Sequence, residues 1–336
     1  MNQPPVRWGI LGTGPIVAKL AGGFRLARGV ALVAIASRDG DRARAAAAHW
    51  NIPHPHGSYE ALLADSGVDA VLVALHNGLH CEWTVRALEA GKHVLCEKPL
   101  APTRAEVDRM FATAHRCRRW LMEGFMYRFH PQIAEATRRV AAIGNVVQVR
   151  AYYQGACPAA GNPRLWPGTG GALLDLGCYC VNLARLFAGE PNHVAAEAHF
   201  VHGVDMTLTG KLTGARATAE FTCSFELPGR YEAEILGTKG RLVLPHPWRP
   251  PAWPAEFLVN DRVVRVEPPA VPADPLAPFA LEIEHFSDCI RHNRPPQFPP
   301  GVDAEQDSRG NVRVLEQLAA GARVTRCAES GSSNRR

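Results

Sequence analysis

Short apolar runs alternate with longer amphipathic segments along the first 124 residues of the chain. The apolar runs are typical of strands that are covered on both faces, and the segments between them have the period of a helix. This alternation predicts an α/β unit with a parallel, doubly wound sheet and right-handed crossovers. The expected strands are 7–11, 30–37, 70–75, 93–96 and 120–123, and the expected helices are 15–28, 39–50, 79–90 and 103–116.

The pattern changes near residue 125. A helix is expected over about 132–142, and 145–153 then alternates apolar and polar residues as a half-buried strand does. Several strand-like segments with glycine turns follow in 194–244, and a helical segment, 170–187, precedes them. Consecutive strands with short turns predict an α+β domain with a large, open, mostly antiparallel sheet.

The predicted domain division follows from this change of pattern. We expect a first domain over 1–124, a second domain over 125–326 and a disordered tail over 327–336. Two helices, starting at about Phe279 and Asp303, close the chain. They are expected either to complete the second domain or to pack back on the first.

Composition narrows the class of protein. The chain has 336 residues, 46% of them apolar, and an excess of five positive charges that is spread along its length. Weak basicity without a recognition motif gives no ground for nucleic acid binding, and no apolar stretch reaches the roughly 20 residues of a membrane span. The nine cysteines are scattered without paired spacing, which predicts reduced thiols and no metal site. With no signal-peptide pattern before the first strand, we expect a cytoplasmic protein.

A glycine-rich turn, Gly12-Thr13-Gly14, follows the first predicted strand and opens the first predicted helix. In this position, glycine permits a tight turn and lets the backbone approach a pyrophosphate at the helix amino terminus. Val17 stands where a smaller residue is usual, and an ordinary strand-to-helix turn is the alternative. The strand–turn–helix context favours dinucleotide binding. The residues expected to bind it here are Gly12, Thr13, Gly14, Pro15 and Ile16.

The end of the second strand, Ala36-Ser37-Arg38-Asp39, bears on which dinucleotide is bound. An acid at this point usually bonds the ribose hydroxyls of NAD, whereas a small polar residue followed by arginine suits the 2′-phosphate of NADP. Arg38, with Arg42 one helical turn later, would pair with that phosphate through charge-assisted bonds beside Ser37. NADP is therefore the expected cofactor, and NAD is the alternative because Asp39 could reach a ribose.

Two further strand ends lie where open α/β sheets bind their ligands. The third strand runs into Leu75-His76-Asn77-Gly78-Leu79-His80, and Leu75, His76, Asn77 and His80 are expected to line the cofactor without acting as acid–base catalysts. The fourth strand ends in Glu97-Lys98-Pro99. We expect Glu97 beside the cofactor and Lys98 beside the nicotinamide ring as a catalytic residue.

Asp175 and Tyr179 are four residues apart in a predicted helix and so share one face. An acid and a phenol directed into one cleft could bind a substrate hydroxyl and relay a proton. An aspartate in the first turn of a helix, next to a partly buried tyrosine, is the alternative. Weaker substrate-site candidates, each of which could equally pack at a domain interface, are Tyr127, Arg128, Tyr153 and Trp166.

Taken together, these motifs resemble the glucose–fructose oxidoreductase and inositol dehydrogenase (Gfo/Idh/MocA) family. The resemblance is carried by residues 9–14, 87–100, 126–131 and 171–179, and it extends over about 7–323. It implies a Rossmann domain followed by an α/β domain whose open sheet forms a homodimer or homotetramer. Many members carry histidine where this chain has Tyr179; the tyrosine resembles the subgroup of dimeric dihydrodiol dehydrogenase and NADP-dependent xylose dehydrogenase.

The resemblance implies NADP-dependent hydride transfer at a carbinol or carbonyl carbon of a sugar or sugar-like polyol, as an aldose dehydrogenase or a ketosugar reductase. Lys98 and Tyr179 carry over as the catalytic pair and Asp175 as a ligand of a substrate hydroxyl. Tyr179 would be the acid/base, with the Lys98 ammonium lowering its pKa. The alternatives are a glycosidase that keeps NAD bound and oxidises its sugar transiently, and a non-catalytic dinucleotide sensor. Tyr179 speaks against the first, and the intact Lys98, Asp175 and Tyr179 speak against the second.

Overall fold

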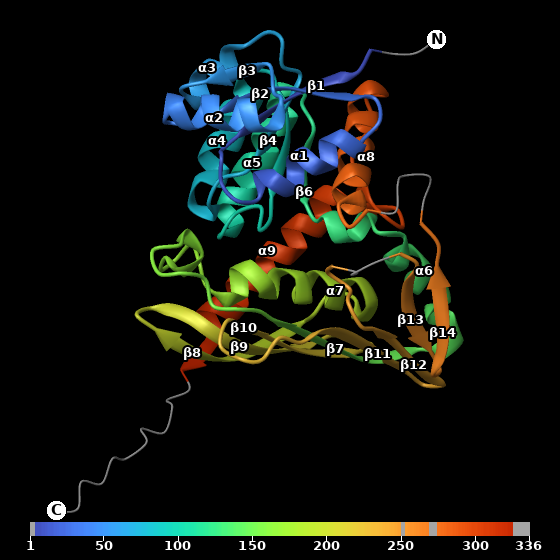
Figure 1. Ribbon diagram of the computed structural model, residues 1–336. Coiled ribbons are helices and arrows are strands. Elements are labelled where there is room, and N and C mark those ends of the chain that lie inside the picture. The colour runs from blue at the N-terminus through green and yellow to red at the C-terminus, as the bar shows by residue number, and fades with distance from the viewer. Residues whose placement is uncertain (1–3, 250–252, 269–273, 325–336) are drawn as a thin grey trace, which may run out of the picture.

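The computed structural model describes residues 4–249, 253–268 and 274–324 of the chain. The described residues form two large sheets, one from each half of the sequence, with helices between them (Figure 1). The tail over 327–336 that was expected to be disordered lies outside the described residues.

The first sheet is parallel, and its six strands lie in the order β3-β2-β1-β4-β5-β6. This order confirms the predicted doubly wound topology. Its strands are β1 (Val6–Leu11), β2 (Val30–Ala36), β3 (His54–His56), β4 (Ala70–Val73), β5 (His93–Glu97) and β6 (Leu121–Gly124). Its helices are α1 (Val17–Leu26), α2 (Gly40–Trp50), α3 (Tyr59–Ala64), α4 (His80–Glu89) and α5 (Arg104–Cys117).

Local capping explains where several of these helices begin. Asp39 caps α2 by accepting hydrogen bonds from the amides of Asp41 and Arg42 at 3.0 and 3.2 Å. Thr103 and Glu106 form a reciprocal capping box at the start of α5. The pair β3 and α3 was not predicted, because β3 is a short polar edge strand without an apolar pattern.

The second sheet has nine strands in the order β14-β13-β12-β11-β7-β10-β9-β8-β17. Its pairs are antiparallel except for β7 with β10 and β8 with β17, so the predicted open and mostly antiparallel sheet is confirmed. Its strands are β7 (Val146–Gln154), β8 (His193–Val201), β9 (Val204–Thr213), β10 (Thr218–Ser224), β11 (Tyr231–Gly237), β12 (Gly240–Leu244), β13 (Ala255–Val259), β14 (Arg262–Val266) and β17 (Ala322–Val324). A separate two-stranded sheet consists of β15 (Gln297–Phe298) and β16 (Val302–Asp303).

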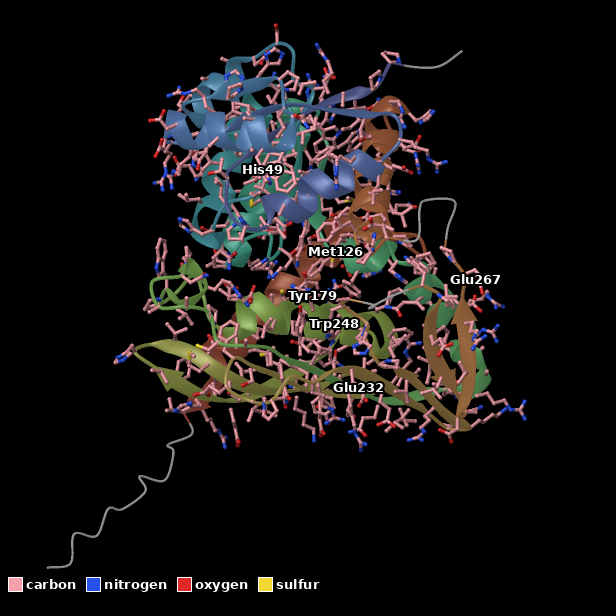
Figure 2. All side chains as sticks on the ribbon, viewed as in Figure 1. His49, Met126, Tyr179, Glu232, Trp248 and Glu267 are labelled. Carbon is pink, nitrogen blue, oxygen red and sulfur yellow. The ribbon has the colours of Figure 1, made fainter. Side chains whose placement is uncertain are left out.

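Helices cover only one face of the second sheet. α7 (Cys178–Ala188) packs on β7 and β10, and α6 (Pro131–Arg139) lies at the β13–β14 end (Figure 1). The opposite face carries no helix from the described part of the chain, and Glu232 extends from it in Figure 2. The side chains that will matter for chemistry therefore lie on the covered face, between the sheet and the first half of the chain.

The two final helices join the halves. α8 (Ala277–Arg291) packs against α1, and the buried indole of Trp8 on β1 donates a hydrogen bond to Ser287 Oγ at 3.0 Å. α9 (Ala304–Gly321) runs between the two sheets and contacts both α5 and α7 (Figure 1). Both helices thus pack back on the first half, which is one of the two placements that the sequence left open. None of the helices within the described residues combines the length and apolarity that a bilayer crossing requires.

Three strands of the second sheet were not predicted. β13 and β14 are joined by Asn260-Asp261, and both of these residues have positive φ, 50° and 62°. This is the geometry of a two-residue hairpin turn, which asparagine and aspartate favour, so the turn was a usable signal. β17 pairs with β8 through only three residues and has no pattern of its own.

Candidate active site

The glycine turn after β1 has the shape that a dinucleotide needs. Gly12 has φ +113°, and a Cβ on it would lie 2.5 Å from the carbonyl oxygen of Ala74, so no other residue fits. A Cβ on Gly14 would meet nothing within 4 Å, which leaves open space in front of the amino terminus of α1. The residues predicted to hold a pyrophosphate, 12–16, therefore form one turn that is exposed at Gly14 and Pro15 and has room for it.

The end of β2 presents arginines to solvent. Ser37 is buried, while Arg38 and Arg42 are exposed. Asp39 is committed to capping α2 and to an ion pair with Arg42 at 3.2 Å, and the Arg42 amide, ahead of other contacts, lowers the Asp39 pKa. These residues fit a phosphate better than a pair of ribose hydroxyls.

The loop after β4 is tied to two other segments. His80 is fully buried, and its ring nitrogens lie 2.9 Å from the Pro99 carbonyl oxygen and 3.0 Å from that of Leu75. Burial lowers the His80 pKa. His80 therefore links the loops that follow β4 and β5. On the other side, Asn77 donates to the Thr169 carbonyl oxygen at 2.8 Å, and His76 packs edge-on against Trp166 at 4.9 Å.

Lys98 brings the two halves of the chain together. At the end of β5, its ammonium donates to the Asp175 carbonyl oxygen at 2.8 Å and to Asp175 Oδ1 at 3.0 Å. The same nitrogen lies 4.9 Å from the centre of the Tyr179 ring. The two ion-paired side chains are only 13% and 15% exposed, so the contact is shielded from water. Lys98, Asp175 and Tyr179 thus form one cluster, the candidate catalytic cluster.

The helix that carries Asp175 and Tyr179 is not uniform, as 170–187 was expected to be. Leu173–Gly177 forms a π-helical turn, and α7 begins only at Cys178. The start of this turn is held by Asp205 on β9, whose carboxylate accepts a hydrogen bond from the Leu173 amide at 2.6 Å. Such turns often mark functional sites. Here the turn presents both the carbonyl and the carboxylate of Asp175 to Lys98.

The pKa values of the three cluster residues depend on burial and on the neighbouring charges. Burial opposes the charge on Lys98, but Asp175 and Tyr179 outweigh it and raise the Lys98 pKa well above its ordinary value. Burial likewise opposes the charge on Asp175, but Lys98 and Arg164 lower the Asp175 pKa. For Tyr179 the balance is reversed: burial raises its pKa well above the ordinary value, although Lys98 acts to lower it. In this structure Tyr179 is therefore a neutral phenol beside a firmly charged lysine.

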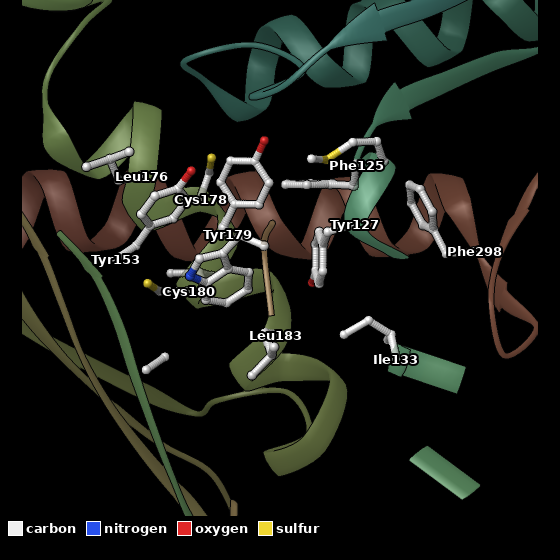
Figure 3. Close-up of a cluster of buried hydrophobic side chains, with 14 of the residues drawn as sticks. Phe125, Tyr127, Ile133, Tyr153, Leu176, Cys178, Tyr179, Cys180, Leu183 and Phe298 are labelled. Atoms are coloured by element: carbon white, nitrogen blue, oxygen red, sulfur yellow. The ribbon is translucent and has the colours of Figure 1, made fainter. Parts of the chain in front are cut away.

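Tyr127 and Tyr153 pack against Tyr179, and the three hydroxyls point in two directions. Figure 3 shows those of Tyr153 and Tyr179 directed toward the first half of the chain, and that of Tyr127 directed away from it. Trp248 stacks on Tyr153 at 5.8 Å and lies next to Tyr179 (Figure 2). Tyr153 is thus placed beside the candidate catalytic cluster.

The Tyr127 ring packs against that of Tyr179 at 5.7 Å, but the Tyr127 hydroxyl and the Arg128 guanidinium bond to residues outside the cluster. Tyr127 donates to Asn182 Oδ1 at 2.5 Å. The fully buried Arg128 donates to Asn182 Oδ1 at 3.1 Å, to the Pro299 carbonyl oxygen at 3.1 Å and to Asp307 at 3.5 Å. A buried guanidinium needs such partners, and they hold α7 and α9 together. These contacts match the alternative of packing between segments that the sequence left open, and substrate binding by Tyr127 and Arg128 stays a prediction.

The remaining predicted residues lie around the cluster. Trp166 is 42% exposed and reaches the cofactor loop through His76, not through Tyr179. Glu97 accepts a hydrogen bond from the Lys98 amide at 3.3 Å, and burial raises its pKa. Both oxygens of Asp175 are occupied, Oδ1 by Lys98 and Oδ2 by Arg164, whose Nε lies at 2.7 Å. A substrate hydroxyl that binds Asp175 would therefore share these oxygens with Lys98 and Arg164.

Sequence reasoning missed Arg164, Arg249 and Lys19. Arg164 lies in a single 3-10 turn, Pro163–Leu165, and Arg249 in a loop, and no spacing or periodicity distinguishes them from other surface arginines. Lys19 is half-buried on α1, close enough to Glu97 and Lys98 for both to affect its pKa, which burial lowers. Its place in the first turns of α1, just after the glycine turn, was the only available signal.

Two family models match the chain. Residues 6–125 match the Gfo/Idh/MocA oxidoreductase family with an NAD-binding Rossmann fold, and residues 133–243 match the Gfo/Idh/MocA C-terminal domain. The chain belongs to the Gfo/Idh/MocA family. The expected family, fold and class of enzyme, an NAD(P)-dependent oxidoreductase acting on CH–OH groups, are thereby confirmed.

Similar members of the Gfo/Idh/MocA family fall in the expected subgroup. An NADP⁺-dependent D-xylose 1-dehydrogenase from Haloferax volcanii is 36% identical, with 97% of this chain and 98% of that protein covered. A trans-1,2-dihydrobenzene-1,2-diol dehydrogenase from Xenopus tropicalis is 34% identical, with 84% and 89% covered. A 3-ketoreductase from Actinomadura kijaniata, solved with NADP and TDP-benzene, superposes with a TM-score of 0.84 at 30% identity, covering 95% of this chain and 98% of that one.

Proposed function

We propose that the protein transfers a hydride between NADP and a carbinol or carbonyl carbon of a sugar or sugar-like polyol, with Tyr179 as acid/base and Lys98 as its partner. The observation that carries the proposal is the meeting of Lys98 from the first half with Asp175 and Tyr179 from the second. The xylose dehydrogenase and the ketoreductase among the relatives support the substrate class and the cofactor.

The cofactor would be held by residues that the structure leaves accessible. The turn over 12–16 fits the pyrophosphate, Arg38 and Arg42 fit a 2′-phosphate, and the loop over 75–77 borders the same edge of the sheet. When bound, NADP supplies the hydride acceptor or donor at its nicotinamide. NADP is preferred over NAD because Asp39, which could have bound a ribose, is already used as a helix cap.

Proton transfer follows from the state of Tyr179. Its hydroxyl makes no hydrogen bond within the described residues and points toward the first half of the chain (Figure 3). As a neutral phenol it can donate a proton to a substrate carbonyl oxygen during reduction. In the oxidation direction the phenolate form takes the proton from a substrate hydroxyl. The Lys98 ammonium stabilises the phenolate that remains and can donate a hydrogen bond to the reacting oxygen. Asp175 keeps Lys98 charged and oriented.

The test follows NADPH absorbance at 340 nm with a panel of aldoses, ketosugars and polyols. Wild-type protein should turn over at least one of them, and Tyr179→Phe and Lys98→Met should each lose about 10²–10⁴ in kcat while still binding NADPH in a fluorescence titration. Wild-type turnover by both variants would refute the assignment. Glycoside cleavage without net cofactor turnover would favour the glycosidase, and binding without any turnover would favour a sensor.

We also propose a homodimer or homotetramer in the cytoplasm. The uncovered face of the nine-stranded sheet supports the oligomer. The eight described cysteines are all free thiols, which supports the cytoplasmic location. Light scattering on the purified protein tests the assembly. A monomer at micromolar concentration would contradict it.

A further inference from the structure

The Asp175 carboxylate is shared by cations from two different segments. Lys98, at the end of β5, donates to Oδ1 at 3.0 Å, and Arg164, in the 3-10 turn Pro163–Leu165, donates to Oδ2 through Nε at 2.7 Å. The Arg164 Nη2 group also bonds to Oδ2. The Asp175 side chain is only 15% exposed, so little water competes for these bonds. Both carboxylate oxygens are therefore occupied by protein donors.

Arg164 is fixed at its backbone and at its guanidinium. Its amide donates to Asn162 Oδ1 at 3.0 Å, and its carbonyl oxygen accepts from the Gly171 amide at 2.8 Å. A Cβ on Gly170 would lie 2.4 Å from that carbonyl oxygen, so the chain closes tightly around it. The guanidinium Cζ lies 5.1 Å from the centre of the Phe225 ring. Because Arg164 is constrained in this way, its ion pair loses less of the side-chain entropy that weakens exposed salt bridges.

The Lys98 ammonium has three N–H donors, and Asp175 uses two of them. One donor is bonded to the Asp175 carbonyl oxygen at 2.8 Å and another to Asp175 Oδ1. Within the described part of the chain, no other acceptor is bonded to this nitrogen, which lies 4.9 Å from the centre of the Tyr179 ring. The third donor is therefore the one that can reach a substrate oxygen at Tyr179. Asp175 Oδ2, on the same carboxylate as Oδ1, would compete for this donor if Arg164 did not occupy it.

We propose that Arg164 is a positioning residue, which holds Asp175 Oδ2 and so keeps the third donor of Lys98 free for the reacting oxygen. This inference rests on the proposed function and adds to it a residue that acts through Asp175. Without Arg164, the carboxylate can turn toward Lys98 and accept hydrogen bonds with both oxygens. The negative charge of Asp175 is then no longer shared, and Lys98 stabilises the Tyr179 phenolate less.

The test measures kcat for oxidation of the best sugar or polyol against pH in wild-type protein, Arg164→Gln and Arg164→Lys. Oxidation needs the phenolate, so kcat rises with pH through the pKa of Tyr179 in the ternary complex. In Arg164→Gln this rise should move to higher pH by about one unit, which lowers kcat about tenfold on the acid side and leaves it near the wild-type value on the alkaline side. Arg164→Lys keeps a cation at Asp175, so its profile should lie between the other two. KM for NADP⁺ should stay within about twofold in both variants.

Arg216→Gln is the matched control, because Arg216 is an exposed arginine on the β9–β10 turn and the change of charge is the same. It should reproduce the wild-type pH profile. The other titratable groups that act on Tyr179 are unchanged in all of these variants: Glu97, Tyr153, Cys178 and Arg249. Two results would overturn the proposal: an Arg164→Gln profile that coincides with the wild-type one, or one that is lowered equally at every pH, which is the effect of a purely structural role.

Failure of the proposed function gives a different result. If Tyr179→Phe keeps wild-type turnover, or if no sugar or polyol is oxidised, the proposed function fails. The role of Arg164 is then judged from crystal structures of wild-type protein and Arg164→Gln with NADPH bound. Both Asp175 oxygens should lie within hydrogen-bonding distance of Lys98 Nζ in the variant, but only Oδ1 in wild-type protein. An unchanged contact between Asp175 and Lys98 in Arg164→Gln would exclude the positioning role.

Discussion

Tyr179 is surrounded by groups that act on its proton in opposite directions. Burial raises its pKa, as do the neighbouring Tyr153 and Cys178, whereas the Lys98 ammonium lowers it. The sequence predicted the lysine but could not show the burial, because burial arises from four rings on three separate segments. A neutral phenol is a proton donor, so the proposed acid/base role of Tyr179 suits reduction of a carbonyl.

Tyr127 gives a direct check on which tyrosines belong to the site. Its hydroxyl donates a hydrogen bond to Asn182 Oδ1 in the interior, and Arg128 donates to the same Asn182 oxygen. We expect Tyr127→Phe to keep kcat and KM within about twofold and to lower the free energy of unfolding by about 1 kcal/mol, the net value of one hydrogen bond. Steady-state kinetics and urea unfolding measure the two quantities. A large rise in KM with unchanged stability would place Tyr127 in the substrate site.

At the scale of single elements, two glycines in one turn have different tasks. We expect Gly12→Ala to lose both stability and cofactor affinity, because its Cβ would collide with the Ala74 carbonyl and its φ of +113° disfavours a side chain. Gly14→Ala should fold normally, since its Cβ meets nothing within 4 Å, but should bind NADPH at least about tenfold more weakly by filling the pyrophosphate space. Thermal melting and fluorescence titration separate the two effects. Equal behaviour of both variants would contradict the assignment.

The π-helical turn should give stability a pH dependence through Asp205. Burial raises the Asp205 pKa to about 6. Its folded pKa thus exceeds the ordinary value by about two units, so its contribution is greatest below pH 4 and is lost as pH rises through 6. Between pH 4 and 7, wild-type protein should lose about 2 kcal/mol of unfolding free energy relative to Asp205→Asn, which still accepts the Leu173 amide. Urea unfolding of both proteins at each pH measures this difference, and parallel pH curves would disprove it.

What could be predicted from the sequence depended on how local the signal was. The apolar strands β1, β2, β4, β5 and β6 were found because each has its own pattern, and the cluster of Lys98, Asp175 and Tyr179 was expected because each residue belongs to a recognisable motif. The π-helical turn was not, since it depends on Asp205 from a distant strand. The interior contacts of Arg128 could not be predicted, because its partner Asp307 lies 179 residues away and leaves no local trace.

At the scale of the whole molecule, the first sheet is completed by the last part of the chain. α8 packs on α1, and Trp8 is in contact with Phe286 and bonded to Ser287. A fragment over 1–124 should therefore expose the apolar surface of α1 and Trp8 and should aggregate or stay partly unfolded. A fragment in which α8 is fused behind residue 124 by a flexible linker should be more stable. Circular dichroism and size-exclusion chromatography measure the folding and assembly of both fragments. A stable, monomeric 1–124 fragment would show that the first half does not depend on α8.

The packing of α8 on α1 also has a consequence for synthesis. A chain leaves the ribosome from its amino terminus, so β1 and α1 emerge long before α8, which begins at Ala277. For most of translation, the apolar surface of α1 is therefore exposed, because α8, which packs on it, has not yet been synthesised. The dinucleotide-binding half, although first in the sequence, is therefore among the last parts of the molecule to be finished, and chaperones have their longest opportunity to bind it there.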